Sequence, residues 1–113
     1  AEGAPRGDPG AVAALAALAS APRQCAEARS AAASALAVVA SRGDAAAMSA
    51  LVGCLEDGRA EVRLGAVRAL PAVAAVWDEG LALAIAERLK DRDAGVRAAA
   101  AAALAARGGE PVV

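Results

Sequence analysis

The chain has 113 residues, a net charge of −1, and no histidine, phenylalanine or tyrosine. Ala supplies 39 of the residues, which favours an all-α fold because Ala is the best helix former. The lack of a basic excess argues against a nucleic-acid binder, since phosphate binding needs a positively charged face. Two Cys without any His exclude a disulfide framework and a zinc site. No apolar run reaches the roughly 18 residues of a membrane span.

The N-terminal stretch has two interpretations. Arg6, the apolar run AVAALAALA and the sequence ASA at 19–21 are together typical of a cleavable targeting signal. The same run is also an ordinary first helix, with Asp8 as its N-cap and Pro9 in its first turn. We favour the helix. Because the chain begins with Ala rather than Met, we expect a processed form or a piece of a longer protein.

A repeat of 34 residues runs along the chain. Arg29, Arg63 and Arg97 are spaced by 34 residues, and each is followed by Ala at +3 and +6 and by Leu at +7. The same offset relates Asp44 to Asp78. A period of this length is typical of a helical solenoid, in which each unit buries its apolar face only by stacking on its neighbours.

Each unit is predicted to be a pair of antiparallel helices. In the middle unit, a helix over 45–55 begins after the cap Asp44, and a second helix runs over 60–73. Pro71 should bend that second helix or end it early. The third unit begins after the cap Asp78, and its inner faces are predicted from the helical spacing to contain Leu81, Ile85, Leu89, Val96, Ala100, Ala103 and Leu104.

The sequence therefore predicts an all-α fold, an α-α superhelix (solenoid) of about three antiparallel helix pairs. The repeat domain is expected over 8–107, with flexible segments at 1–7 and 108–113. Its three units span about 8–42, 43–76 and 77–107.

The motif L-x-D-x-x-x-x-V-R-x-x-A-x-x-A-L resembles the HEAT repeat family, in the short form similar to that of phycobilisome (PBS) lyases. It occurs at Leu55, Asp57, Val62, Arg63, Ala66, Ala69 and Leu70, and again at Leu89, Asp91, Val96, Arg97, Ala100, Ala103 and Leu104. The first unit matches only from Ala28 onward.

The resemblance implies a ladder of hydrogen bonds between successive units. In this ladder Asp57 and Asp91 pair with a neighbouring Arg29, Arg63 or Arg97. Arg23 stands at the Asp position of the first unit, which implies a break there.

No residue pattern in the sequence points to catalysis. Without His and Tyr, proton transfer would rest on Asp, Glu, Lys or Cys, and the glycine-rich phosphate motifs are absent. Helix capping accounts better than cell adhesion for the Arg-Gly-Asp tripeptides at 6–8 and 42–44, and better than catalysis for the acidic residues at the turns, which are Glu56, Asp57, Glu61, Asp91 and Asp93. We expect no enzymatic activity, no catalytic residue, no cofactor and no metal.

The two cysteines, Cys25 and Cys54, fall near the turns of adjacent units. A disulfide between them is conceivable. Two free thiols, packed as small apolar side chains, are the favoured interpretation.

Four residues are candidates for binding a partner. Leu64 and Arg68 are predicted to point away from the core, on the helix that lines the concave side in the HEAT family. Leu83 lies opposite the apolar face of its helix. Trp77 either packs on the first turn of the next helix as a hydrophobic staple or inserts into a partner's pocket.

The sequence thus predicts a non-catalytic scaffold for protein–protein interaction, a subunit or piece of a larger intracellular assembly with protein partners. Two alternatives follow from the resemblance to HEAT proteins. One is an accessory subunit of a photosynthetic or other organellar membrane complex, with a plastid location. The other is a bilin lyase or chaperone-like protein that handles bilin chromophores.

Overall fold

The computed structural model describes residues 8–108, which form six α-helices and one short 3₁₀ helix. In chain order these are α1 (Pro9–Ser20), α2 (Ala26–Val39), α3 (Ala45–Cys54), α4 (Ala60–Val73), α5 (Glu79–Glu87), η1 (Arg88–Lys90) and α6 (Ala94–Gly108). These residues contain no strand, so the predicted all-α fold is confirmed for them. The predicted flexible segments lie outside the described residues, except Gly108, which ends α6.

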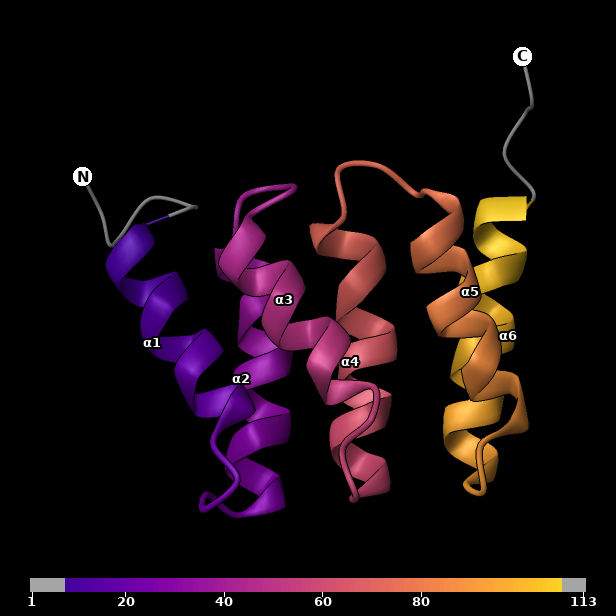
Figure 1. Ribbon diagram of the computed structural model, residues 1–113, viewed down its shortest axis with the longest axis horizontal. Helices are drawn as coiled ribbons and strands as arrows, with labels where there is room; N and C mark the ends of the chain where they lie inside the picture. The colour runs from indigo at the N-terminus through magenta and orange to yellow at the C-terminus, as the bar shows by residue number, and fades with distance from the viewer. Residues whose placement is uncertain (1–7, 109–113) are drawn as a thin grey trace.

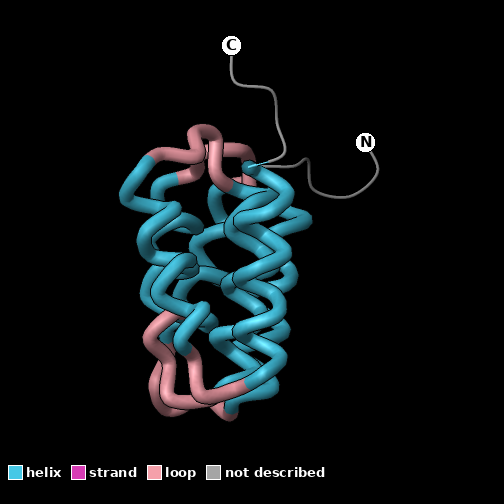
Figure 2. The backbone as a smooth tube through the Cα atoms, turned by 90° about the vertical axis from the view of Figure 1, so that its right-hand side faces the viewer, coloured by secondary structure: helices cyan, strands magenta, loops and turns pink. Residues whose placement is uncertain are grey.

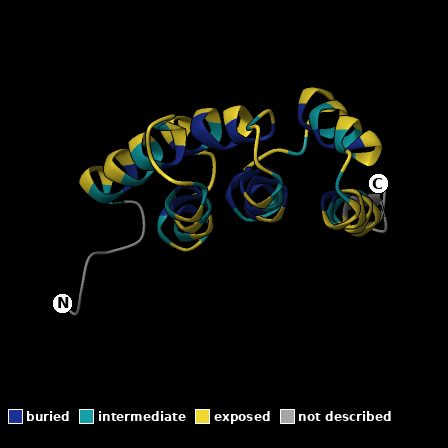
Figure 3. Ribbon diagram, turned by 90° about the horizontal axis from the view of Figure 1, so that it is seen from below, coloured by how far each residue is buried: buried dark blue, intermediate teal, exposed yellow. Residues whose placement is uncertain are grey.

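The helices lie in two layers (Figures 1 and 3). Helices α1, α3 and α5 form one layer, and α2, α4 and α6 form the other. Each helix of the first layer packs on the helix that follows it in the chain, and α4 contacts both α2 and α6. The turns gather at the two ends of the layers (Figure 2). Three helix pairs therefore stand side by side in chain order.

The core between the layers consists of aliphatic side chains and many alanines. The largest fully buried side chains are Val12, Leu36, Leu51, Leu55, Val62, Val67, Leu70, Val73, Ile85 and Val96. Alanines such as Ala33, Ala47 and Ala66 are completely buried among them and let the helix backbones approach closely. Each buried Ala removes little area from water, and helices α1 to α4 each pack against at least two other helices.

Aspartates cap the helices as predicted. A backbone N–H in the first turn donates to the side chain of Asp8 at 3.3 Å, of Asp44 at 2.9 Å and of Asp78 at 2.8 Å. Asp93 accepts in the same way at the start of α6, at 3.0 Å. Each such bond satisfies a donor that the helix start leaves unpaired and stabilises it by about 1 kcal/mol. The capping interpretation of the Arg-Gly-Asp tripeptides is confirmed at Asp8 and Asp44.

Pro71 does not end α4 early, because the helix continues to Val73. Proline lacks an N–H, so at this place it removes only the bond to the Val67 carbonyl, in the last turn. Arg42 Nη1 donates to the carbonyl oxygens of Pro71 at 3.4 Å and Ala74 at 2.9 Å. The guanidinium of Arg42, from the linker between α2 and α3, thus satisfies carbonyls at the C-terminal end of α4, where the helix dipole is negative.

The placement of Leu89 on the inner face was wrong. Helix α5 ends at Glu87, and Leu89 lies in η1 with 43% of its surface exposed. Leu55, its counterpart in the second unit, is only 2% exposed. A third helix pair follows Leu55, whereas no further pair follows Leu89 among the described residues.

The two linkers between helix pairs are equally long but differ in conformation. Gly43 has a φ of +79°, which glycine adopts without a Cβ clash, and its N–H donates to the Val73 carbonyl at 2.6 Å. Trp77 is its counterpart in the repeat, and no residue other than glycine has a positive φ in 8–108. The second linker therefore cannot repeat this turn. The layers also differ here, because α5 barely contacts α3 whereas α3 packs against α1.

We expect Gly43→Ala to lower the free energy of unfolding by about 1–2 kcal/mol, because a non-glycine residue is strained at this φ. The new Cβ would also lie 3.0 Å from that of Ala75. Gly53→Ala is the matched control, since a Cβ there meets nothing within 4 Å. Because alanine favours a helix more than glycine does, Gly53→Ala should raise the free energy of unfolding by about 0.5–1 kcal/mol. Urea denaturation measures the stability of both variants, and equal stability of Gly43→Ala and wild type would show that position 43 does not require glycine.

Candidate functional site

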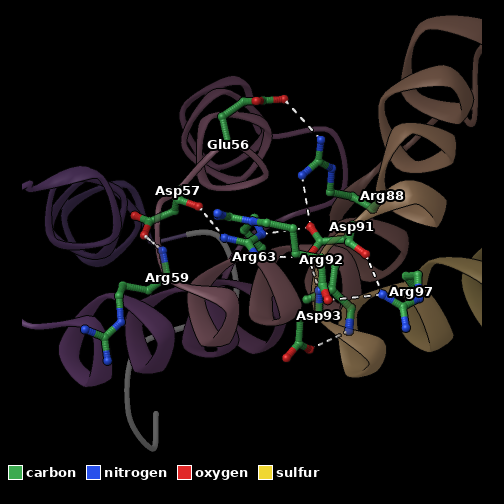
Figure 4. A network of polar contacts seen from close by, with 10 residues as sticks. Glu56, Asp57, Arg59, Arg63, Arg88, Asp91, Arg92, Asp93 and Arg97 are labelled. Carbon is green, nitrogen blue, oxygen red and sulfur yellow. Dashed lines mark hydrogen bonds and ion pairs between the residues drawn. The ribbon is translucent and has the colours of Figure 1, made fainter.

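Buried arginine–aspartate pairs join successive helix pairs at one end of the layers. Arg29 of α2 donates from Nε and Nη2 to the two carboxylate oxygens of Asp57, both at 3.0 Å. Arg63 of α4 holds Asp91 in the same way, at 2.8 and 2.9 Å (Figure 4). Both contacts are bidentate, which fixes the orientation of the two groups as well as their distance.

The repeat accounts for this geometry. Each arginine lies on the second helix of one unit, and its aspartate lies 28 residues further on, in the turn of the next unit. The remaining nitrogen, Nη1, binds the arginine's own turn: that of Arg63 donates to the Asp57 carbonyl at 2.8 Å, and that of Arg29 donates to the Gln24 carbonyl. Every paired guanidinium therefore connects two turns.

Asp91 receives more donors than its partner Arg63 supplies. Arg88 Nη1 donates to its Oδ2 at 3.0 Å, and the backbone N–H of Asp93 donates to Oδ1 at 2.9 Å. Arg88 stands where the second unit has Cys54, and it was not predicted to take part in the ladder. The available signal was an arginine three residues before an aspartate, a spacing that lets two side chains meet in a helical turn.

These contacts determine the protonation of both carboxylates. Hydrogen bonds from Arg63 lower the pKa of Asp91 to about 2 and outweigh burial, which raises it. At Asp57 burial raises the pKa, but hydrogen bonds from Arg29 and from the Arg59 backbone outweigh this effect and leave it below its ordinary value. Both groups stay ionised at neutral pH and are unsuited to act as general bases, since their charge is already neutralised by a paired arginine.

The two cysteines are free thiols, so a disulfide between them is contradicted. Cys54 is buried, and its Sγ donates to the Ala19 carbonyl at 3.4 Å. Burial raises the pKa of this thiol, which keeps it protonated and a poor nucleophile. Cys25 is exposed just before α2, which corrects the expectation that both would pack as apolar side chains.

The four residues predicted to bind a partner do not come together. Arg68 is exposed on α4, and Leu64, one turn earlier, is half-buried against the core. Leu83 is 60% exposed but lies on α5, in the other layer. Trp77 is half-buried against the core in the linker before α5. Leu64 and Arg68 are thus the two candidates that share a helix.

Arg68 lies between two shallow grooves walled by small residues. One runs between α2 and α4 and is lined by Ser34, Ala37, Gly65, Arg68 and Ala69. The other has a volume of about 490 Å³, runs between α4 and α6, and is lined by Val67, Arg68, Pro71, Gly95, Ala98, Ala99, Ala102 and Ala103. The sequence analysis missed Gly95 in this wall, although its spacing from Ala98, Ala99 and Ala102 was the signal for a small-residue face.

No protein-family model, curated protein or solved structure matches the chain. Among residues 8–108 no helix combines the length and the apolar character needed to cross a bilayer. The same residues contain no group of three or more side chains that could hold a metal ion. The geometry of the described residues is therefore the basis for any functional argument.

We expect Arg63→Ala to lower the free energy of unfolding by about 3 kcal/mol, because it leaves the Asp91 carboxylate buried with only Arg88 as a cationic partner. Arg59→Ala is the matched control. It removes an exposed arginine 3.6 Å from Glu61, and such a pair contributes less than about 1 kcal/mol. Chemical denaturation compares the two variants, and similar losses in both would refute a structural role for the buried pair.

Stability should fall in acid between about pH 4 and pH 2. Folding lowers the pKa of Asp91 from 3.8 to about 2, so its contribution is complete above pH 4 and is lost as the carboxylate becomes protonated in the folded state. Asp91→Asn should reduce this acid-dependent loss and be less stable at pH 7, whereas Glu61→Gln, at an exposed position, should keep the wild-type profile. Thermal unfolding across this pH range measures the contribution of Asp91. If Asp91→Asn loses stability as steeply as wild type, Asp91 does not cause the loss in acid.

Proposed function

We propose that the protein is a non-catalytic scaffold for protein–protein interaction, built as an α-solenoid of HEAT-like units. The observation that carries this proposal is the repeated bidentate contact, Arg29 with Asp57 and Arg63 with Asp91, at 2.8–3.0 Å. It uses the most buried charged groups to join one helix pair to the next. Stacks held in this way present extended outer surfaces on which other proteins can bind.

The absence of catalysis is part of the proposal. The carboxylates of the buried Asp91 and the partly buried Asp57 are paired with arginines, and the buried thiol of Cys54 is protonated at neutral pH. Neither an activated nucleophile nor a poised base is therefore available among these groups. The membrane-complex and bilin alternatives rest on the family resemblance, and no contact among the described residues favours either of them.

The groove between α4 and α6 is the proposed contact surface. Its walls consist mainly of alanine and glycine, which let a partner backbone approach closely. Arg68 at its edge supplies a planar donor group that can bind a carboxylate or a carbonyl of the partner. An extended or helical segment with an acidic residue beside its small-residue contact fits this surface best.

The test is to capture partners on the immobilised full chain, purify one of them, and measure its affinity for three proteins. Arg68→Glu should weaken binding at least about 10-fold relative to wild type, because it places a negative charge at the groove. Arg59→Glu makes the same charge change at an exposed turn outside the groove and should bind as wild type does. Failure to capture any partner, or equal effects of both variants, would contradict the proposal.

A further inference from the structure

Arg97 occupies the ladder position of the third unit but holds no carboxylate among residues 8–108. Its Nη1 donates to the Asp91 carbonyl at 2.7 Å, as Nη1 of Arg63 donates to the Asp57 carbonyl at 2.8 Å. The Nε and Nη2 atoms that bind an aspartate in Arg63 have no hydrogen-bond partner within the described part of the chain. Arg97 is exposed, whereas Arg63 is 4% exposed.

Two leucines of the third unit are also more exposed than their counterparts in the second unit. Leu89 is 43% exposed, whereas its counterpart Leu55 is 2% exposed. Leu104 is half-buried, whereas its counterpart Leu70 is completely buried. A basic group and two leucines of the third helix pair are therefore each more exposed than their counterparts in the second pair. We call Leu89, Arg97 and Leu104 the end face.

A second copy of the chain does not fit the end face. Stacked head to tail, it would bring its first unit against Arg97. That unit has Arg23 where the second and third units have Asp57 and Asp91. Two guanidinium groups would then meet where a carboxylate is needed, and juxtaposed like charges disfavour such a complex.

We propose that the end face binds a helical hairpin of a partner protein whose turn presents an aspartate or glutamate to Nε and Nη2 of Arg97. The partner's second helix covers Leu89 and Leu104, so the hairpin takes the position of a further helix pair beside the third unit. This inference rests on the proposed scaffold function and adds the chemistry of one partner. The backbone contact already holds the Arg97 side chain, so less conformational freedom is lost when the carboxylate binds.

The test uses the purified 113-residue chain itself as the probe, with charges reversed at its two ends. Wild type should remain monomeric in sedimentation equilibrium. Arg23→Asp supplies the missing carboxylate to a neighbouring copy and should lower the dissociation constant of head-to-tail association at least about 10-fold. Adding Arg97→Ala to that variant should restore wild-type behaviour. Arg59→Asp changes the net charge equally at another exposed turn and should not associate.

Two further variants distinguish an effect of charge on association from an effect of a substitution on folding. Arg97→Asp alone should also associate, now through the unchanged Arg23, whereas the double variant Arg23→Asp/Arg97→Asp should not. The inference is overturned if Arg23→Asp stays as monomeric as wild type, or if its association survives Arg97→Ala. It is also overturned if wild type itself associates through Arg97. Because these measurements need no partner, their failure is separate from a failure to capture a partner at the α4–α6 groove.

Discussion

The register of the stack depends on one interaction, the bidentate contact between a guanidinium and the carboxylate in the next turn. The core beneath it consists largely of alanine and aliphatic side chains, whose contacts are non-directional and would allow neighbouring helix pairs to slide. The contacts Arg29–Asp57 and Arg63–Asp91 accept only one relative position of the two turns. A buried ion pair adds little net stability over apolar packing, so we assign these pairs the role of fixing spacing and orientation.

Departures from the repeat give each unit its own properties. Arg88 replaces a buried cysteine and gives Asp91 a second cationic neighbour at 3.0 Å. Trp77 replaces a glycine in the left-handed conformation, which alters the linker before α5. Arg23 stands where the other units have an aspartate. The first unit therefore has no carboxylate at this position that could pair with the arginine of a unit stacked before it. The repeated residues thus form the contacts between units, and the residues that depart from the repeat change the contacts of single units.

The sequence predicts the helices and caps well because both follow from local rules. Helical spacing placed α3 and α4, and the caps Asp44 and Asp78 follow from the preference of carboxylates for unpaired N–H groups. The exposure of Leu89 could not be predicted, since it depends on whether another element covers that position. Leu64, Trp77 and Leu83 belong to different predicted elements, and whether they share one surface also lies beyond helical periodicity, because it depends on how whole helices are arranged.

The weak contact between α3 and α5 has a mechanical consequence. The first two helix pairs are held through both layers, since α1 packs on α3 and α2 packs on α4. The third pair is attached mainly through α4 and α6 and the Arg63–Asp91 contact. A pulling force along the stack would therefore open the joint between the second and third pairs first, with α5 swinging away from α3 about the α4–α6 seam. We therefore expect the first two helix pairs to move as one body and the third pair to move more easily relative to them.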